Sequence, residues 1–125
     1  VVGDGAFQMT GTELSTVVRH GFDPIVIILN NQGYTTERFI KEGPYNDILD
    51  WNYHRLPEVL GAGRGYLVQT EGDFERAWSL ANEQRGSYSL LNVVLEKLDH
   101  SPALERLGRR LAEKVRKGGG GPEET

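Results

Sequence analysis

The sequence predicts an α/β fold, a parallel sheet flanked by helices, and three observations support that class. Short apolar runs alternate with segments whose apolar residues recur at helical spacing, and strands separated by helices form parallel sheets with right-handed crossovers. The 125 residues are enough for one domain of ordinary size and too few for two. Polar turns follow two of the apolar runs, and ligands in such sheets bind beyond the carboxyl ends of the strands.

Four segments have the character of strands. Val1 and Val2 lead into a glycine turn and resemble the end of a buried strand. Because a strand takes about five residues, we expect the sequence to be truncated at its N-terminus. Residues 25–29 are apolar and mostly β-branched, which is typical of a strand buried on both faces. The segments 66–69 and 89–95 are the remaining expected strands.

Helices are expected between and after these strands, over residues 12–20, 35–40, 57–60 and 73–84 and from Pro102 onward. Gly21 is expected to end the first of them, and Ser101 with Pro102 at the first helical position to open the last. The helix over 73–84 is expected to pack through Phe74, Ala77, Trp78 and Ala81. Among the aromatic residues, we expect Trp51, Tyr53 and Trp78 to lie in the core.

The charge is unevenly distributed. The formal net charge is −4, but residues 101–117 hold six basic and two acidic side chains, which makes that segment +4 and the remainder −8. Apolar residues recur there at helical spacing, so we predict an amphipathic helix with a solvated basic face, with its stripe at Leu104, Leu107, Leu111 and Val115. Nucleic-acid binding is not expected, because no recognised motif or aromatic interleaving accompanies the charge.

Composition excludes other classes of protein. No apolar run is long enough to cross a bilayer, so no membrane association is expected. Cysteine is absent, which rules out disulfides and thiolate chemistry.

Two turns carry the candidate chemistry, one at Gly3-Asp4-Gly5 and one at Asn30-Asn31-Gln32-Gly33. Neighbouring strands lie about 4.8 Å apart, so Asp4 and Asn31 can meet where their strands end. A carboxylate, an amide oxygen and the Gly33 carbonyl are the hard oxygen ligands that Mg²⁺ or Ca²⁺ takes. Mg²⁺ usually also binds phosphate oxygens, and glycines with a helix start beside them suit a diphosphate. A pair of ordinary turns is the alternative, but the matching strand ends favour a site.

The same residues resemble a known family. Gly3-Asp4-Gly5, then 24 residues, then Asn30-Asn31 is similar to the signature of thiamine-diphosphate enzymes. The stretch from Asn30 to Glu37 resembles pyruvate, indolepyruvate and branched-chain 2-oxo acid decarboxylases. The indolepyruvate and branched-chain members are most similar at Tyr45-Asn46-Asp47-Ile48, Trp51-Asn52-Tyr53 and Leu56-Pro57. The resemblance implies that residues 1–117 are the C-terminal part of the diphosphate-side domain, in the thiamine-diphosphate-binding fold. Residues 118–125 are expected to be a flexible glycine-rich tail.

The resemblance implies roles residue by residue. Asp4, Asn31 and the Gly33 carbonyl would hold Mg²⁺ against the diphosphate. The cofactor-binding set would be Gly3, Asp4, Gly5, Ala6, Asn31, Gly33, Tyr34 and Thr35. Ala6 stands where the family often has serine, so any contact there would come from the backbone.

Glu37 would be the catalytic residue of the decarboxylase, beside the substrate carboxylate. A carboxyl in such surroundings is protonated more readily and can relay a proton to the carbanion left by carbon dioxide. The alternative is a first-turn glutamate that favours a helix N-terminus. Thr36 and Ile40 would line the substrate pocket, where Thr36 adds a hydroxyl at a position that is often Ile or Val.

The implied activity is that of a carboxy-lyase that converts a 2-oxo acid to an aldehyde and carbon dioxide, with thiamine diphosphate and Mg²⁺. The family's catalytic histidines belong to the pyrimidine-binding domain of a second subunit, and His20, His54 and His100 match none of them. A cytoplasmic homodimer or homotetramer is implied, with this chain inactive alone.

Two other functions remain open. One is a thiamine-diphosphate carboligase or synthase, which the stretch from Tyr34 to Glu37 disfavours. The other is a non-catalytic module that uses Asp4 and Asn31 only for a metal or nucleotide. The sequence leaves the substrate open among pyruvate, branched-chain 2-oxo acids, phenylpyruvate and indolepyruvate.

Overall fold

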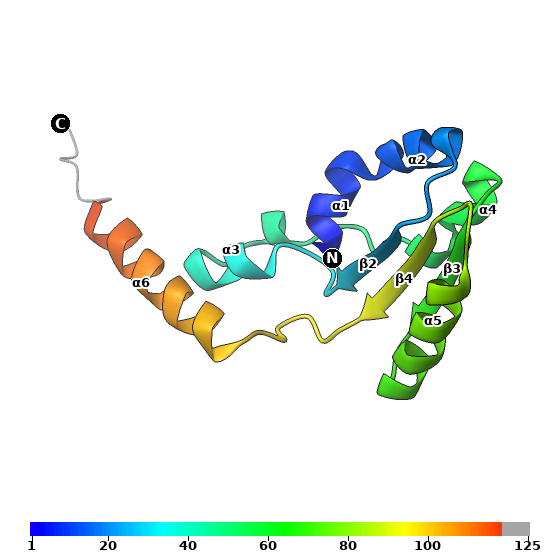
Figure 1. Ribbon diagram of the computed structural model, residues 1–125. Coiled ribbons are helices and arrows are strands. Elements are labelled where there is room, and N and C mark those ends of the chain that lie inside the picture. Colours follow the sequence, from blue (N-terminus) through cyan, green and yellow to red (C-terminus); the bar gives the residue numbers. More distant parts are fainter. Residues whose placement is uncertain (119–125) are drawn as a thin grey trace.

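A computed structural model describes residues 1–118, which form a four-stranded parallel sheet with helices on both faces (Figure 1). The strand order is β1-β2-β4-β3, and each neighbouring pair is parallel. The strands are β1 (Val2–Gly3), β2 (Ile25–Asn30), β3 (Arg64–Val68) and β4 (Ser89–Val94). The predicted fold class and all four predicted strands are confirmed.

Six α-helices and three short 3₁₀ helices accompany these strands within residues 1–118. The α-helices are α1 (Asp4–Thr10), α2 (Leu14–His20), α3 (Thr35–Ile40), α4 (Leu56–Leu60), α5 (Glu71–Glu83) and α6 (Pro102–Gly118). The 3₁₀ helices are η1 (Gly11–Glu13), η2 (Pro44–Asn46) and η3 (Tyr53–Arg55). The helix predicted over 12–20 therefore begins later, at Leu14, because η1 occupies its expected first turn.

The helix ends follow local sequence signals. α2 stops at Gly21, as predicted. α5 begins two residues before the predicted start, because Thr70 and Asp73 form a capping box: the Asp73 N–H donates to Thr70 Oγ1 at 3.1 Å, and the Thr70 N–H donates to Asp73 Oδ2 at 3.0 Å. At α6, Pro102 is the first helical residue and the Leu104 N–H donates to Ser101 Oγ at 3.2 Å, which confirms the predicted opening.

A buried core lies on each face of the sheet. One cluster joins the sheet to α1, α2 and η3 through Phe7, Leu14, Ile28, Tyr53, Tyr88 and Leu90. The other lies under α5 and contains Val68, Ala77, Ala81 and Leu91. Successive residues of β4 face opposite sides, so one strand serves both cores.

Two predictions about burial were wrong. Trp51 and Trp78 are 37% and 43% exposed, although Tyr53 is fully buried as expected. α5 meets the sheet through two alanines, so the larger Trp78 ring lies beside the contact and stacks on Phe74 instead. Leu29 of β2 is also 37% exposed, although the next residue, Asn30, is buried.

α6 extends away from the sheet and starts beside α3 (Figure 1). A Cβ added at Gly108 would collide with the Cβ of Phe39, so the backbone of α6 contacts the side chain of Phe39 on α3. Leu107 and Val115 of the predicted apolar stripe are exposed. Gly118 is the last residue of α6, and the rest of the tail expected at 118–125 lies outside the described residues. Among residues 1–118, no helix has the length and apolarity that crossing a membrane requires.

Candidate functional site

Asp4 and Asn31 lie together where β1 and β2 end. The register pairs Val2 with Ile28 and Gly3 with Leu29, so the two turns emerge side by side. Asp4 is 1% exposed. Its Oδ1 accepts the Gly5 N–H at 2.8 Å, and its Oδ2 accepts the Gly33 N–H at 3.1 Å. The structure thus brings the three sequence-predicted metal ligands to one edge of the sheet.

Burial raises the pKa of the Asp4 carboxyl above its usual value, and hydrogen bonds from backbone N–H groups, Gly5 and Gly33 first, partly oppose that shift. The loss of hydration therefore destabilises the ionised carboxylate by more than its hydrogen bonds stabilise it. A cation at this carboxylate would offset the remaining cost.

The turn that carries Asn31 has an unusual backbone. Gln32 has φ 61° and Gly33 has φ 148°, both in the positive region that side chains disfavour. A Cβ added at Gly33 would collide with the Asn46 carbonyl oxygen and would lie 2.5 Å from Nη2 of Arg38. Only glycine fits at this position, for reasons of both conformation and space.

The Asn31 amide completes the group. With its nitrogen toward Asp4, it donates to Asp4 Oδ1 at 3.2 Å and to the Gly33 carbonyl at 3.0 Å, and its oxygen accepts from Thr35 Oγ1 at 2.8 Å. The opposite orientation turns the amide oxygen toward the other two oxygens. Three converging oxygens repel one another unless a cation lies among them, so the amide can serve either state of the site.

The chemistry of this group is that of oxygen ligands alone. Among residues 1–118, no three His, Cys, Asp or Glu side chains gather in one place. One carboxylate, one amide oxygen and one carbonyl suit a hard cation that keeps part of its coordination sphere for water or phosphate.

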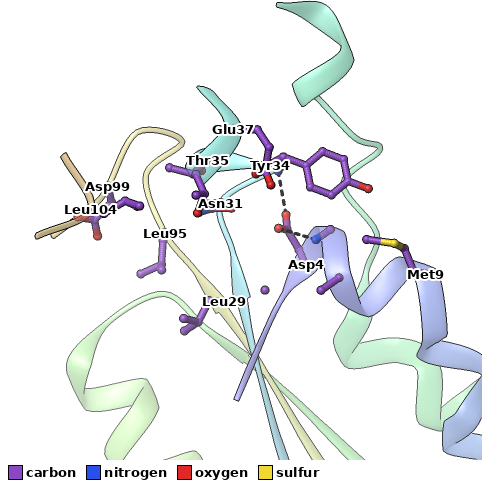
Figure 2. A pocket seen from close by; sticks show the side chains of 15 residues that line it. Asp4, Met9, Leu29, Asn31, Tyr34, Thr35, Glu37, Leu95, Asp99 and Leu104 are labelled. Atoms are coloured by element: carbon purple, nitrogen blue, oxygen red, sulfur yellow. Dashed lines mark hydrogen bonds between the residues drawn. The ribbon is translucent and has the colours of Figure 1, made fainter. Parts of the chain in front are cut away.

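A cavity of about 430 Å³ opens beside Asp4 (Figure 2). Its lining residues are Gly3, Asp4, Gly5, Ala6, Met9, Leu29, Asn31, Gly33, Tyr34, Thr35, Thr36, Glu37, Leu95, Asp99 and Leu104. All residues predicted to bind the cofactor therefore line one cavity, together with Glu37 and Thr36. Ile40 does not line it, because four residues along α3 correspond to a rise of about 6 Å away from Thr36.

Five lining residues were not predicted from the sequence. Leu29 and Leu95 lie at or just beyond the carboxyl ends of β2 and β4, and the rule that ligands bind at strand ends could have found them. Met9 lies one helical turn beyond Ala6. Asp99 and Leu104 come from the segment around the start of α6, which no motif marks.

Glu37 and Tyr34 occupy the α3 side of the cavity. Figure 2 shows the Glu37 side chain directed toward the part of the cavity where Asp4 lies, and Glu37 is exposed. The Tyr34 ring covers Gly5: a Cβ there would lie 2.5 Å from its Cε1. Gly5 was predicted from the sequence to lie next to a phosphate, and in the structure its missing side chain also leaves room for this ring.

No histidine within residues 1–118 lines the cavity. His20 ends α2 and stacks on Phe22, His54 faces Asn92 at 3.4 Å, and His100 packs against Phe39. The structure gives none of them a place beside Asp4 or Glu37.

Residues 1–93 match the family of the thiamine pyrophosphate enzymes in their C-terminal TPP binding domain. The chain belongs to this family. The resemblance predicted from the sequence is confirmed, and so is thiamine diphosphate, the same compound as thiamine pyrophosphate, as the cofactor of the matched domain.

Curated relatives of this thiamine pyrophosphate enzyme chain are named as decarboxylases. An alpha-keto-acid decarboxylase of Mycobacterium tuberculosis (strain ATCC 25618 / H37Rv) is 41% identical over 103 residues, 79% of this chain and 18% of the relative. One from Mycolicibacterium paratuberculosis (strain ATCC BAA-968 / K-10) is 38% identical over 113 residues, 87% of this chain and 20% of the relative. Pyruvate decarboxylase 2 of Arabidopsis thaliana is 37% identical over 116 residues, 89% of this chain and 19% of the relative. The chain spans about a fifth of the length of these relatives.

Proposed function

We propose that this chain supplies the diphosphate-binding side of a thiamine-diphosphate- and Mg²⁺-dependent 2-oxo acid decarboxylase, a carboxy-lyase that forms an aldehyde and carbon dioxide. The observation that carries the proposal is the convergence of Asp4, Asn31 and the Gly33 carbonyl beside a cavity that Glu37 also lines. The names of the curated relatives support the reaction class. The resemblance favours an indolepyruvate- or branched-chain-like substrate.

Mg²⁺ fits the residues present. The Asp4 carboxylate, the Asn31 amide oxygen and the Gly33 carbonyl would hold the ion and leave the rest of its coordination sphere to diphosphate and water. The ion would also offset the burial of the Asp4 charge, which raises the pKa of that carboxyl. Gly3, Gly5, Ala6, Tyr34 and Thr35 complete the proposed cofactor-binding set, and a Cβ at Gly3 would meet nothing within 4 Å.

Thiamine diphosphate, when bound, supplies the electron sink that decarboxylation of a 2-oxo acid requires. The protein's part is to position the substrate and move a proton. We assign the proton transfer to Glu37, whose carboxylate forms no ion pair with any described residue and faces the cavity. Thr36 lines the same cavity and would contribute a hydroxyl to the substrate pocket, and Ile40 stays a predicted pocket residue that the structure does not bring to the cavity.

The active site is proposed to be shared with the pyrimidine-binding domain of a second subunit, in a cytoplasmic homodimer or homotetramer. The resemblance implies catalytic histidines, and no histidine of residues 1–118 lines the cavity, so those groups would come from that domain. The same proposal makes residues 1–117 the C-terminal part of the diphosphate-side domain, inactive by themselves.

The test is aldehyde formation by the complete gene product from a panel of 2-oxo acids, with and without Mg²⁺ and thiamine diphosphate. Glu37→Gln should lower kcat by about 100-fold or more, because general acid–base catalysis contributes about 10²–10⁴-fold. Glu42→Gln is the matched control, an exposed glutamate just after α3 that does not line the cavity.

Each outcome separates one function from the others. Cofactor-dependent aldehyde release that Glu37→Gln abolishes supports the decarboxylase, and the preferred substrate identifies the subclass. Products in which two substrates are joined would favour a carboligase. A folded protein that binds the cofactor without turning over any 2-oxo acid would contradict the decarboxylase and leave a binding module.

A further inference from the structure

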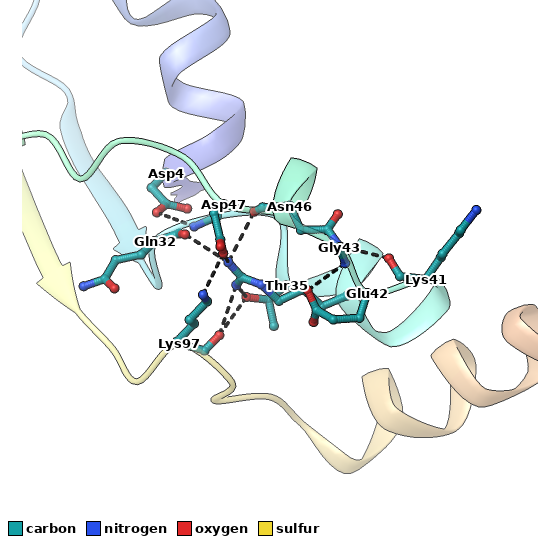
Figure 3. A network of polar contacts seen from close by, with 11 residues as sticks. Asp4, Gln32, Thr35, Lys41, Glu42, Gly43, Asn46, Asp47 and Lys97 are labelled. Carbon is teal, nitrogen blue, oxygen red and sulfur yellow. Dashed lines mark hydrogen bonds and ion pairs between the residues drawn. The ribbon is translucent and has the colours of Figure 1, made fainter.

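Arg38 is the most buried cation near the site, with a side chain 1% exposed to solvent. It belongs to α3, yet its guanidinium reaches into the centre of three loops. Figure 3 shows Gln32, Asn46, Asp47 and Lys97 gathered around that centre. Each loop presents a backbone carbonyl to the guanidinium, so Arg38 joins the turn after β2, the end of η2 and the segment after β4.

The first contact fixes a peptide group of the site. Arg38 Nη2 donates to the Gln32 carbonyl at 3.0 Å. The N–H of the same peptide belongs to Gly33 and donates to Asp4 Oδ2 at 3.1 Å. The peptide between Gln32 and Gly33 is therefore held at its oxygen by Arg38 and at its N–H by Asp4.

The second contact acts on the next peptide. The Asn46 carbonyl accepts from Arg38 Nη2 at 3.2 Å and from the Tyr34 N–H at 2.9 Å. That N–H shares its peptide with the Gly33 carbonyl, the oxygen proposed to bind Mg²⁺. Arg38 thus acts on both peptides that flank Gly33, and together these peptides set the direction in which the Gly33 carbonyl points.

The remaining contacts hold the guanidinium itself in place. Asp47 Oδ1 accepts from Arg38 Nη2 at 2.6 Å and from Lys97 Nζ at 2.7 Å. Arg38 Nη1 donates to Thr35 Oγ1 at 3.2 Å and to the Lys97 carbonyl at 3.3 Å. Nη2 faces three acceptors with two N–H groups, so one of these is shared, and the two N–H groups of Nη1 face two acceptors, while the Nε–H has no partner among the described residues. A lysine ammonium has three N–H groups and no plane, so it cannot reproduce this set of contacts.

We propose that Arg38 is a positioning residue for the metal: it holds the Gly33 carbonyl and N–H in place, so that the oxygens of Asp4, Asn31 and Gly33 are arranged before Mg²⁺ and diphosphate arrive. This inference rests on the proposed function of those three residues. Residues that orient metal ligands typically change metal affinity about 10- to 100-fold when they are replaced. The loop that Arg38 orients has two successive residues at positive φ, a conformation that needs such outside support.

The decisive experiment measures binding of Mg²⁺ and of thiamine diphosphate to the complete gene product by isothermal titration calorimetry. Arg38→Lys keeps the charge but loses the planar set of contacts. We expect its half-saturating concentrations of both ligands to rise about 10- to 100-fold. We expect kcat at saturating cofactor to stay within about threefold of the unsubstituted protein, because Arg38 does not line the cavity.

Lys97→Met is the matched control. It removes the second cation from Asp47 and leaves the three backbone carbonyls bound by Arg38. Half-saturation in this variant should stay within about threefold of the unsubstituted protein, since its lost contact is a partly exposed ion pair. If ligand binding is weakened equally in Lys97→Met and Arg38→Lys, Arg38 only contributes to the general stability of the loops, and the proposal is overturned.

Three further outcomes are also decisive. Unchanged half-saturation in Arg38→Lys, while the unsubstituted protein binds both ligands, overturns the role of Arg38 and leaves the proposed function intact. No ligand binding by the unsubstituted protein overturns the proposed function and this inference with it. If Arg38→Lys does not fold, Asp47→Asn replaces it: a severalfold weakening of binding supports the proposal, and unchanged binding overturns it.

Discussion

The ring of Tyr34 lies against the α-carbon of Gly5, so that a Cβ there would be 2.5 Å from Cε1 of the ring. The two residues come from different turns, one at the start of α1 and one at the start of α3. This contact joins the Asp4 turn to the Asn31 turn beside the cavity, in addition to the hydrogen bond between Asp4 and Gly33.

Gly5→Ala should therefore be costly although alanine favours helices. We expect a loss of about 1–3 kcal/mol in the free energy of unfolding, because the new methyl group displaces the Tyr34 ring. Urea unfolding of the complete gene product checks this. Gly3→Ala is the control, because its Cβ would meet nothing within 4 Å, and it should leave stability nearly unchanged. Equal effects of the two substitutions would contradict the contact.

Gly33→Ala should be more severe, because it combines a forbidden φ of 148° with a collision against the Asn46 carbonyl. We expect a loss of about 3 kcal/mol in stability. Gly61→Ala is the milder comparison: Gly61 has φ 69°, in the left-handed region, with open space around it, and its substitution should cost about 1 kcal/mol. The difference between the two unfolding free energies in urea gives the combined cost of the collision and of the more extreme φ at Gly33, and a Gly33→Ala variant no worse than Gly61→Ala would disprove it.

Asp47 should make stability depend on pH in the acid range. Hydrogen bonds from Lys97 and Arg38 hold the pKa of the Asp47 carboxyl below its usual value of 3.8. Because the pKa of Asp47 is lower in the folded state than in the unfolded state, the ionised carboxylate stabilises the folded protein. This stabilisation is complete above pH 3.8 and is lost as the pH falls through the lower, folded-state pKa. Asp47→Asn should lower the thermal midpoint above about pH 5, and the difference from the unsubstituted protein should vanish in stronger acid.

The control for Asp47→Asn is Glu83→Gln, at an exposed position on α5. Its thermal midpoint should follow that of the unsubstituted protein across the same pH range. A difference between Asp47→Asn and the unsubstituted protein that persists unchanged into strong acid would mean that the carboxylate charge is not what stabilises these loops.

The contact between Gly108 and Phe39 should set the docking of α6 on α3. Gly108→Ala adds a methyl group where the Phe39 Cβ already lies, and Phe39→Gly removes that Cβ. A double-mutant cycle of unfolding free energies should give a coupling of about 0.5–3 kcal/mol, with the double variant more stable than the sum of the single losses predicts. Additive losses would show that the helices do not meet there. Limited proteolysis of residues 96–101 would report loosening of the same contact.

Local sequence patterns were enough to predict the helices and strands and the proximity of Asp4 to Asn31. Apolar runs and helical spacing predicted the strands and helices, and parallel strands that share a carboxyl edge bring the turns after β1 and β2 together. Ser101 and Pro102 mark the start of α6 because capping depends on residues a few positions apart. The exposure of Trp78 could not be predicted in this way. Helical spacing identifies the apolar face of α5, but it does not show how closely Ala77 and Ala81 let that face approach the sheet.

The sequence by itself determined the fold class, the pair of strand-end turns and the family to which the chain belongs, because each depends on periodicity or on a motif within one short stretch. Only the tertiary structure decided the role of Arg38, the partner of Gly5 and the place of Asp99 and Leu104 on the cavity wall. The physical reason is that a buried guanidinium is satisfied by backbone carbonyls, which every residue carries. No pattern of side chains in the sequence therefore predicts which backbone carbonyls the fold will bring within hydrogen-bond distance of Arg38. Gln32 and Lys97, which supply two of them, lie in loops far apart in the sequence.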